Sequence, residues 1–246
     1  MLSGLAICFF LSPGQSQPPG TGTVVATTSW TAAYAKAAGA TDVAVLAPYE
    51  MVHPSEYELR PGDIVRLIKA RLIVYAGYEV IVKQLNTGLN ISADKMVKIT
   101  TSYNYSEIEK SVMQIAVQLG TEKIAVENLK EIKDLLLKGR VEVQKAGIDK
   151  QIVLVHFFQE SFARELGITP AIVFGPAPPE PKQIMEMART KAGLILDNAH
   201  SPVGEPMKEV IKNGKYQLLL NFPGLFNTRT LSDVIIYNTD KIIKGN

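Results

Sequence analysis

The sequence predicts an α/β protein of two βα lobes, each with a mostly parallel four-stranded sheet, joined by a single long rigid helix. Short β-branched segments alternate with longer segments of helical periodicity, a pattern typical of parallel sheets whose strands are buried on both faces. Four strand-like segments precede residues 121–146 and four follow them. Residues 121–146 contain no strand pattern and place apolar residues at helical spacing, so we expect one helix there.

The first lobe is predicted over residues 23–120. Pro61 suits the first turn of a helix, and Ser106 followed by Glu109 predicts a capping box at the start of another. The expected strands are Val24–Thr28, Val43–Ala47, Leu72–Tyr75 and Val97–Thr100, and the expected helices are Trp30–Ala38, Pro61–Ala70, Glu79–Leu85 and Ser106–Leu119.

A linking helix is predicted over residues 121–147, where Ile124, Leu129, Ile132 and Leu136 recur among Lys and Glu. At about 1.5 Å per residue such a helix is roughly 35–40 Å long. One small lobe does not need that length, so we interpret the helix as a rigid strut between two lobes.

The second lobe is predicted over residues 148–246, and Pro202 again suits the first turn of a helix. The expected strands are Ile152–Val155, Ala171–Phe174, Gly193–Asp197 and Gln217–Asn221, and the expected helices are Phe158–Leu166, Glu180–Thr190, Pro202–Lys212 and Arg229–Lys244.

Residues 1–22 are interpreted as a leader and a flexible segment. Leu2–Leu11 is an apolar run followed by a stretch rich in Pro and Gly. The run is too short to span a bilayer but matches the core of a secretory signal, although no Lys or Arg precedes it. Cys8 is a candidate lipoprotein acylation site, with Ile7 where a small residue is expected. We therefore expect export to the periplasm or the outer face of the cytoplasmic membrane, with the mature chain soluble or tethered.

Composition excludes several classes of function. The chain has 246 residues with 26 basic and 24 acidic side chains, and no basic block that would follow a phosphate backbone, so nucleic acid is not an expected partner. One Cys excludes an internal disulfide and a thiolate zinc cluster. No dinucleotide fingerprint, Walker loop, nucleophile elbow or zinc-hydrolase helix occurs.

The three histidines all follow predicted strands. His53 follows the strand Val43–Ala47 by a short loop, His156 ends the fifth strand, and His200 follows the seventh. In parallel α/β sheets, ligands bind beyond the carboxyl ends of the strands. For any one of them a hydrogen-bonded structural role is the commoner explanation, but three histidines at the same end of their sheets favour a ligand site.

Several motifs resemble the metal-specific substrate-binding proteins of ABC importers, the ZnuA/TroA-like group. The most specific stretch is Val45–Gly77, which is similar to that family's strand, D-P-H-x-Y-E loop, P-S-D helix start and V-V-Y-N-G strand end. Residues 152–168 resemble its strand, ligand His and helix, and residues 175–202 resemble its E-P-S-P helix and following strand. The resemblance implies two βα lobes joined by one long helix, with metal in the cleft between them.

The resemblance also shows departures at the expected metal ligands. The family's first ligand His falls on Ser55, its second on Tyr103, and its carboxylate ligand on Asn221, whereas the third ligand matches His156. His53 stands two positions before Ser55, where the family usually has Asp. The His-rich acidic loop of many zinc members is absent.

Two interpretations of the site remain open. In the first, His53, His156 and His200 form a rebuilt site, with Glu56, Glu160 or Asp197 completing or orienting it; imidazole favours Zn²⁺ over Mn²⁺. In the second, the metal site is lost and the cleft binds another small ligand through hydrogen-bonding and stacking groups. Those groups would be Tyr78, Asn104, Tyr103, Tyr105 and Asn221.

The resemblance implies an extracytoplasmic, monomeric solute-binding protein that captures a divalent metal, with zinc as the expected ion, and delivers it to an ABC permease. An enzyme is not expected, because no motif places a carboxylate as general base, although a catalytic zinc hydrolase is a further alternative. A degenerate partner that docks on a transporter without cargo is another.

Overall fold

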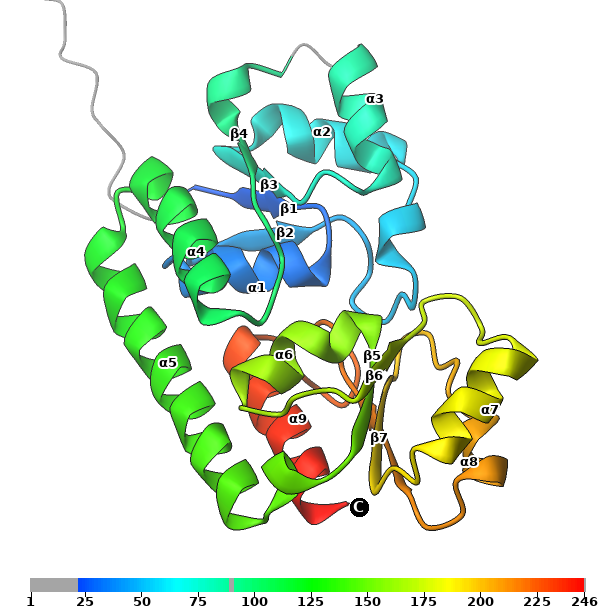
Figure 1. The fold of residues 1–246 in the computed structure, drawn as a ribbon. Coiled ribbons are helices and arrows are strands. Elements are labelled where there is room, and N and C mark those ends of the chain that lie inside the picture. The colour runs from blue at the N-terminus through cyan, green and yellow to red at the C-terminus, as the bar shows by residue number, and fades with distance from the viewer. Residues whose placement is uncertain (1–21, 89–90, 246) are drawn as a thin grey trace, which may run out of the picture.

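The computed structural model describes residues 22–88 and 91–245, and these form two lobes joined by one long helix (Figure 1). Each lobe contains a four-stranded sheet, with strand orders β2-β1-β3-β4 and β6-β5-β7-β8. All pairings between neighbouring strands are parallel. The predicted fold class is therefore confirmed. The leader and Cys8 lie outside the described residues.

The first lobe alternates strands and helices as the sequence predicts. Buried Val and Ile side chains fill β1 and β3, so helices cover the sheet on both faces. The elements are β1 (Val24–Ala26), α1 (Ser29–Ala37), β2 (Val43–Val45), a 3₁₀ turn (Pro54–Glu56), α2 (Pro61–Lys69), β3 (Leu72–Tyr75), α3 (Val80–Gly88), a 3₁₀ turn (Ala93–Lys95), β4 (Met96–Lys98) and α4 (Tyr105–Leu119).

The second lobe repeats the scheme after α5 (Glu122–Lys145), whose chain enters it through a 3₁₀ turn at Ile148–Lys150. The remaining elements are β5 (Val153–His156), a 3₁₀ turn (Phe157–Gln159), α6 (Glu160–Glu165), β6 (Ile172–Phe174), α7 (Pro181–Arg189), β7 (Leu194–Asn198), α8 (Met207–Val210), β8 (Lys215–Leu219) and α9 (Leu231–Lys244). No helix in the described part of the chain is long and apolar enough to cross a membrane.

Two local predictions are wrong. Helix α4 begins at Tyr105 and is capped by Asn104, whose Oδ1 accepts a hydrogen bond from the Glu107 N–H at 3.3 Å. Ser106 therefore lies inside the first turn and cannot form the predicted capping box. Residues 202–206 are not helical, because buried Asp197 accepts the N–H groups of Val203 and Gly204 and holds this segment as a loop. Only the short α8 follows.

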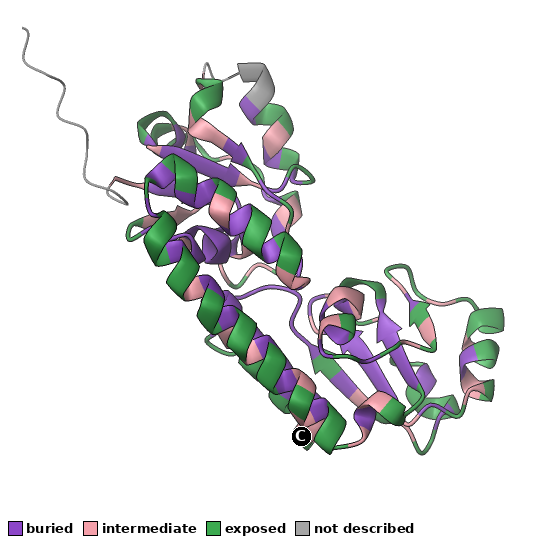
Figure 2. Cartoon of the chain, turned by 60° about the vertical axis from the view of Figure 1, so that its left-hand side comes forward, coloured by how far each residue is buried: buried purple, intermediate pink, exposed green. Residues whose placement is uncertain are grey.

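Helix α5 packs along both lobes. Its buried residues include Leu129, Ile132 and Leu136. In Figure 2 buried positions recur along this long helix among exposed ones. One cluster of buried apolar side chains runs from Val24 in the first lobe through α5 to Val234 in the second. The lobes thus fold around a common core, and the domain limits at residues 120 and 148 stay a prediction.

Candidate functional site

A cavity of about 920 Å³ lies between the lobes, a volume typical of small-molecule sites. It is lined by loops that follow the carboxyl ends of strands in both sheets, as predicted for parallel sheets. From the first lobe come Thr28, Trp30, Val52, His53, Pro54, Ser55, Tyr78, Thr101, Ser102, Asn104 and Glu107; from the second come Phe157, Phe158, Glu160, Ser161, Arg164, Asn198, His200, Ser201, Asn221 and Phe222.

His53 lies on the first-lobe wall of this cleft. It immediately precedes the 3₁₀ turn Pro54–Glu56 and is exposed. Its side chain makes no capping bond to that turn. Ser55 also lines the cleft, whereas Glu56 is exposed outside the lining. His53 is therefore the accessible imidazole of the site.

His200 lies on the opposite wall, two residues after β7, and is buried. Its Nδ1 accepts a hydrogen bond from the Asn221 N–H at 3.3 Å, and its ring stacks on Phe222 with 3.7 Å between ring centroids. Burial, and secondly the nearby His53, lowers the pKa of His200 to about 4. The ring is thus neutral at pH 7.

His156 ends β5 but does not line the cleft. Its ring packs against Phe158 and Phe174, with centroid distances of 5.3 and 5.6 Å. The Nε2 atom lies against Gly175, where a Cβ atom would come within 2.6 Å of it. Burial lowers the pKa of His156, and nearby Asp197 opposes that shift. His156, the one position where the family resemblance matches a ligand, is therefore packed beneath the cleft wall of the second lobe.

Both buried histidines have the same tautomer. Nδ1 of His156 accepts the Phe158 N–H at 3.1 Å, as Nδ1 of His200 accepts the Asn221 N–H. A neutral imidazole that accepts at Nδ1 carries its proton on Nε2. A metal-bound His instead donates its second ring N–H to a carboxylate or carbonyl. In this structure the Nε2 atom of each buried ring carries a hydrogen and has no lone pair to give to a metal ion.

The three imidazoles do not converge. Across residues 22–88 and 91–245, no group of three or more His, Cys, Asp and Glu side chains is arranged to hold a metal ion. His53 and His200 share the cleft, while His156 stands outside it. The three-histidine site stays a prediction.

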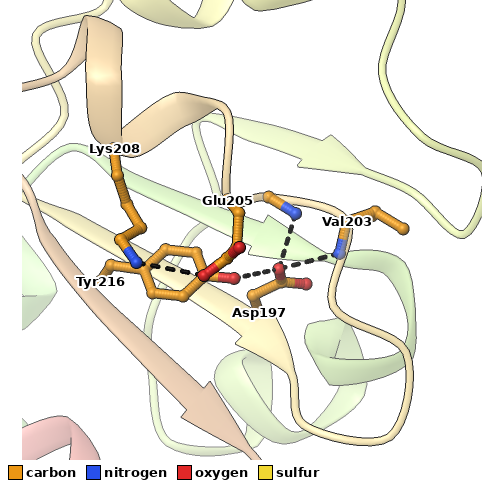
Figure 3. A network of polar contacts seen from close by, with 6 residues as sticks. Asp197, Val203, Glu205, Lys208 and Tyr216 are labelled. Atoms are coloured by element: carbon orange, nitrogen blue, oxygen red, sulfur yellow. Dashed lines mark hydrogen bonds and ion pairs between the residues drawn. The ribbon is translucent and has the colours of Figure 1, made fainter.

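Of the three predicted carboxylates, Glu56 is exposed outside the cleft lining, Glu160 is a cleft residue and Asp197 has a structural role. Glu160 lines the cleft and pairs with Arg164 at 2.8 Å. Asp197 is buried and accepts hydrogen bonds from the Val203 and Gly204 N–H groups and the Tyr216 hydroxyl, at 3.1, 2.6 and 2.6 Å (Figure 3). Asp197 therefore fastens the loop that carries His200.

Some of the predicted tyrosines and amides line the cleft and others lie outside it. Tyr78, Asn104 and Asn221 line the cleft, whereas Tyr103 and Tyr105 do not. Tyr103 is fully buried and stacks on Trp30 with 5.8 Å between ring centroids. Its ring also meets Phe162 of the second lobe edge-on, with 5.7 Å between centroids, so Tyr103 packs between the lobes.

Sequence reasoning missed several cleft residues, of which Trp30 is the most informative. Trp30 is the single Trp of the chain and follows the first strand, so the rule that drew attention to the histidines applies to it as well. The other missed residues are Thr28, Val52, Pro54, Thr101, Ser102, Glu107, Phe157, Phe158, Ser161, Arg164, Asn198, Ser201 and Phe222.

No family model matches the sequence, and no curated protein matches it. Several solved structures match the chain in fold. A Mn-bound periplasmic metal binding protein from Candidatus Liberibacter asiaticus superposes with a TM-score of 0.66 and 15% identity, covering 91% of this chain and 99% of that one. The SBP FpvC of P. aeruginosa in complex with Ni²⁺ superposes with a TM-score of 0.69 and 18% identity, covering 91% of this chain and 96% of that one. AdcAII of Streptococcus pneumoniae superposes with a TM-score of 0.69 and 18% identity, covering 92% of this chain and 98% of that one.

These likenesses show the fold. The chain has the two-lobe architecture of periplasmic metal-binding solute-binding proteins, and the resemblance found in the sequence is confirmed at that level. Two of these neighbours are named as a metal binding protein and as an SBP, in line with the predicted binding-protein fold.

Proposed function

We propose that this chain, with the fold of metal-binding solute-binding proteins, captures a divalent metal in its interlobe cleft and delivers it to an ABC permease. Zn²⁺ is the expected ion, and the site of action is outside the cytoplasmic membrane. The observation that carries the proposal is that exposed His53 lines a cleft between the lobes to which Glu107 and Glu160, one from each lobe, also contribute. The Mn²⁺- and Ni²⁺-bound neighbours of the same fold support a divalent cargo.

His53 is the side chain through which the protein contacts the metal. It is exposed, and Ser55 lies two residues away on the same wall. Glu107 and Glu160, one from each lobe, also line the cleft and add negative charge. Because an imidazole binds metal only when unprotonated, we expect capture to weaken in acid.

Calorimetric titration of untagged protein with Zn²⁺ and Mn²⁺, each free and as a 1:1 citrate complex, tests the proposal. We expect His53→Ala to weaken zinc binding at least tenfold. His156→Asn is the matched control, because its Oδ1 can still accept the Phe158 N–H and the position is outside the cleft. Absence of binding for both metals in both forms would refute metal capture.

Loss of the metal site remains the second candidate function. The Nε2–H tautomer of His200 favours it, since a hydrogen-bond donor suits an organic solute better than a metal ion. Metal-independent binding of an organic solute would establish this candidate.

A further inference from the structure

Three buried polar atoms of residues that line the cleft have no hydrogen-bond partner among the described residues. They are Trp30 Nε1, His200 Nε2 and Asn221 Oδ1, and all three residues line the cavity. His200 and Asn221 are only 4% and 7% exposed. Buried polar groups are normally paired, so such a cluster at a cavity indicates contacts to a ligand.

The three atoms lie along one stretch of wall. Asn221 and Phe222 are consecutive, the His200 ring stacks on Phe222, and the Trp30 ring lies 6.2 Å from Phe222 between centroids. Trp30 belongs to the first lobe and the others to the second. A solute held here would contact both lobes at once.

Two of these groups are hydrogen-bond donors. Indole Nε1 can only donate, and His200 donates at Nε2 because its Nδ1 accepts the Asn221 N–H. Donors of this kind recognise carboxylate or carbonyl oxygens. They cannot coordinate a metal ion.

The cavity is also larger than a bare ion requires. A metal ion with six waters occupies on the order of 200 Å³, at about 30 Å³ per water. The cleft holds about 920 Å³. Its lining includes exposed apolar or aromatic side chains of both lobes, Val52 and Tyr78 on one and Phe157 and Phe158 on the other, each 39–56% exposed. An organic body would cover these surfaces.

We propose that the cleft takes its divalent metal as a complex with a small polycarboxylate chelator, whose oxygens accept hydrogen bonds from Trp30 Nε1–H and His200 Nε2–H. The inference rests on the proposed function, because it keeps the metal as cargo. The chelator supplies most of the ligands that the described residues do not assemble, and His53 contacts the metal.

The experiment compares three probes by calorimetry: Zn²⁺ alone, a 1:1 Zn²⁺–citrate complex and citrate alone, with nitrilotriacetate as a second chelator. Trp30 is the single Trp, so its fluorescence reports binding at the cleft directly. We expect a Zn²⁺–chelator complex to bind at least tenfold more tightly than Zn²⁺ or the chelator alone, with a change in Trp30 emission.

A matched pair of substitutions tests the donor. His200→Asn keeps an acceptor where Nδ1 receives the Asn221 N–H but removes the Nε2–H donor, and we expect at least tenfold weaker binding of the complex. His200→Gln places an amide N–H near the Nε2 position, and we expect it to retain most of the affinity. Trp30→Phe removes the other donor with the aromatic ring kept, and should also weaken binding.

The outcomes separate this inference from the proposed function. Zn²⁺ alone binding as tightly as its complexes would overturn the chelator and leave metal capture standing. A chelator alone binding as tightly as its complex would overturn both, because the cargo would be an organic solute. Absence of binding for every probe would overturn both, and equal affinities of the Asn and Gln variants at position 200 would overturn the assigned donor.

Discussion

His200 shows how burial fixes the protonation state of a single side chain. Its Nδ1 accepts a backbone N–H and its ring is covered by Phe222. The protonated ring is therefore disfavoured in the folded protein, and its pKa falls to about 4 from an ordinary value near 6.5. This shift couples the stability of the fold to pH.

We expect stability to fall as the pH drops from 6.5 to 4. Above pH 6.5 the ring is neutral in both states, so it adds no pH dependence. Between 6.5 and about 4 the unfolded chain binds a proton that the folded chain does not, and below 4 the loss levels off. At pH 4.5 the cost is about 2–3 kcal/mol.

Urea denaturation at pH 7 and pH 4.5 measures this difference. His200→Asn is the comparison, because it keeps the acceptor and removes the titrating ring. A wild-type protein that loses no more stability than the variant between these pH values would contradict the assigned protonation state.

The direction in which each histidine points could not be predicted from the sequence. All four residues of β5 are buried, so alternation along the strand does not distinguish the cleft side from the packed side at His156. The tautomers depend on the backbone N–H groups of Phe158 and Asn221, and the second of these belongs to a segment 21 positions away. Sequence position placed the histidines near strand ends, and tertiary contacts decided their chemistry.

At the scale of elements, the strand and helix pattern was largely predictable because buried parallel strands and amphipathic helices have distinct periods. The exceptions have local causes. Asn104 competes with Ser106 for the cap of α4, and Asp197 captures backbone N–H groups that the predicted helix at Pro202 would need. In both cases a polar side chain a few residues earlier in the chain overrides the helix signal.

The loop after β8 has a residue that no other amino acid can replace easily. Gly224 has φ +147°, and a Cβ atom there would lie 2.1 Å from the Tyr49 carbonyl oxygen of the other lobe. We expect Gly224→Ala to lower the free energy of unfolding by about 2–4 kcal/mol, through backbone strain and overpacking.

The matched control is Gly62→Ala. Gly62 lies in the first turn of α2, and a methyl group added there would have no other atom within 4 Å, so we expect a small gain of up to about 1 kcal/mol. Chemical denaturation of both variants makes the comparison. Equal effects of the two substitutions would refute the close approach of the lobes at Gly224.

At the scale of the whole molecule, one apolar core joins the lobes through α5. We therefore expect the protein to unfold in a single transition, with Trp30 fluorescence and far-ultraviolet circular dichroism giving the same midpoint. Leu136→Ala, at a position 2% exposed, should lower the midpoint and cost about 2–4 kcal/mol while keeping one transition.

Leu137→Ala is the control on the same helix. Leu137 is 51% exposed, so we expect a change within about 0.5 kcal/mol. Two separate transitions in the wild-type protein would show that the lobes are independent folding units.

The common core also bears on the thermodynamics of capture. Lobes that fold together form the cleft before any ligand binds. Most of the conformational entropy of ordering the cleft is therefore lost on folding, and little is lost on binding. Little new apolar surface is then buried by lobe movement, and the heat-capacity change of binding should reflect the cargo itself. Under the proposed function, we expect release to depend on competition for the cargo by the receptor, because there is no large movement of the lobes to reverse.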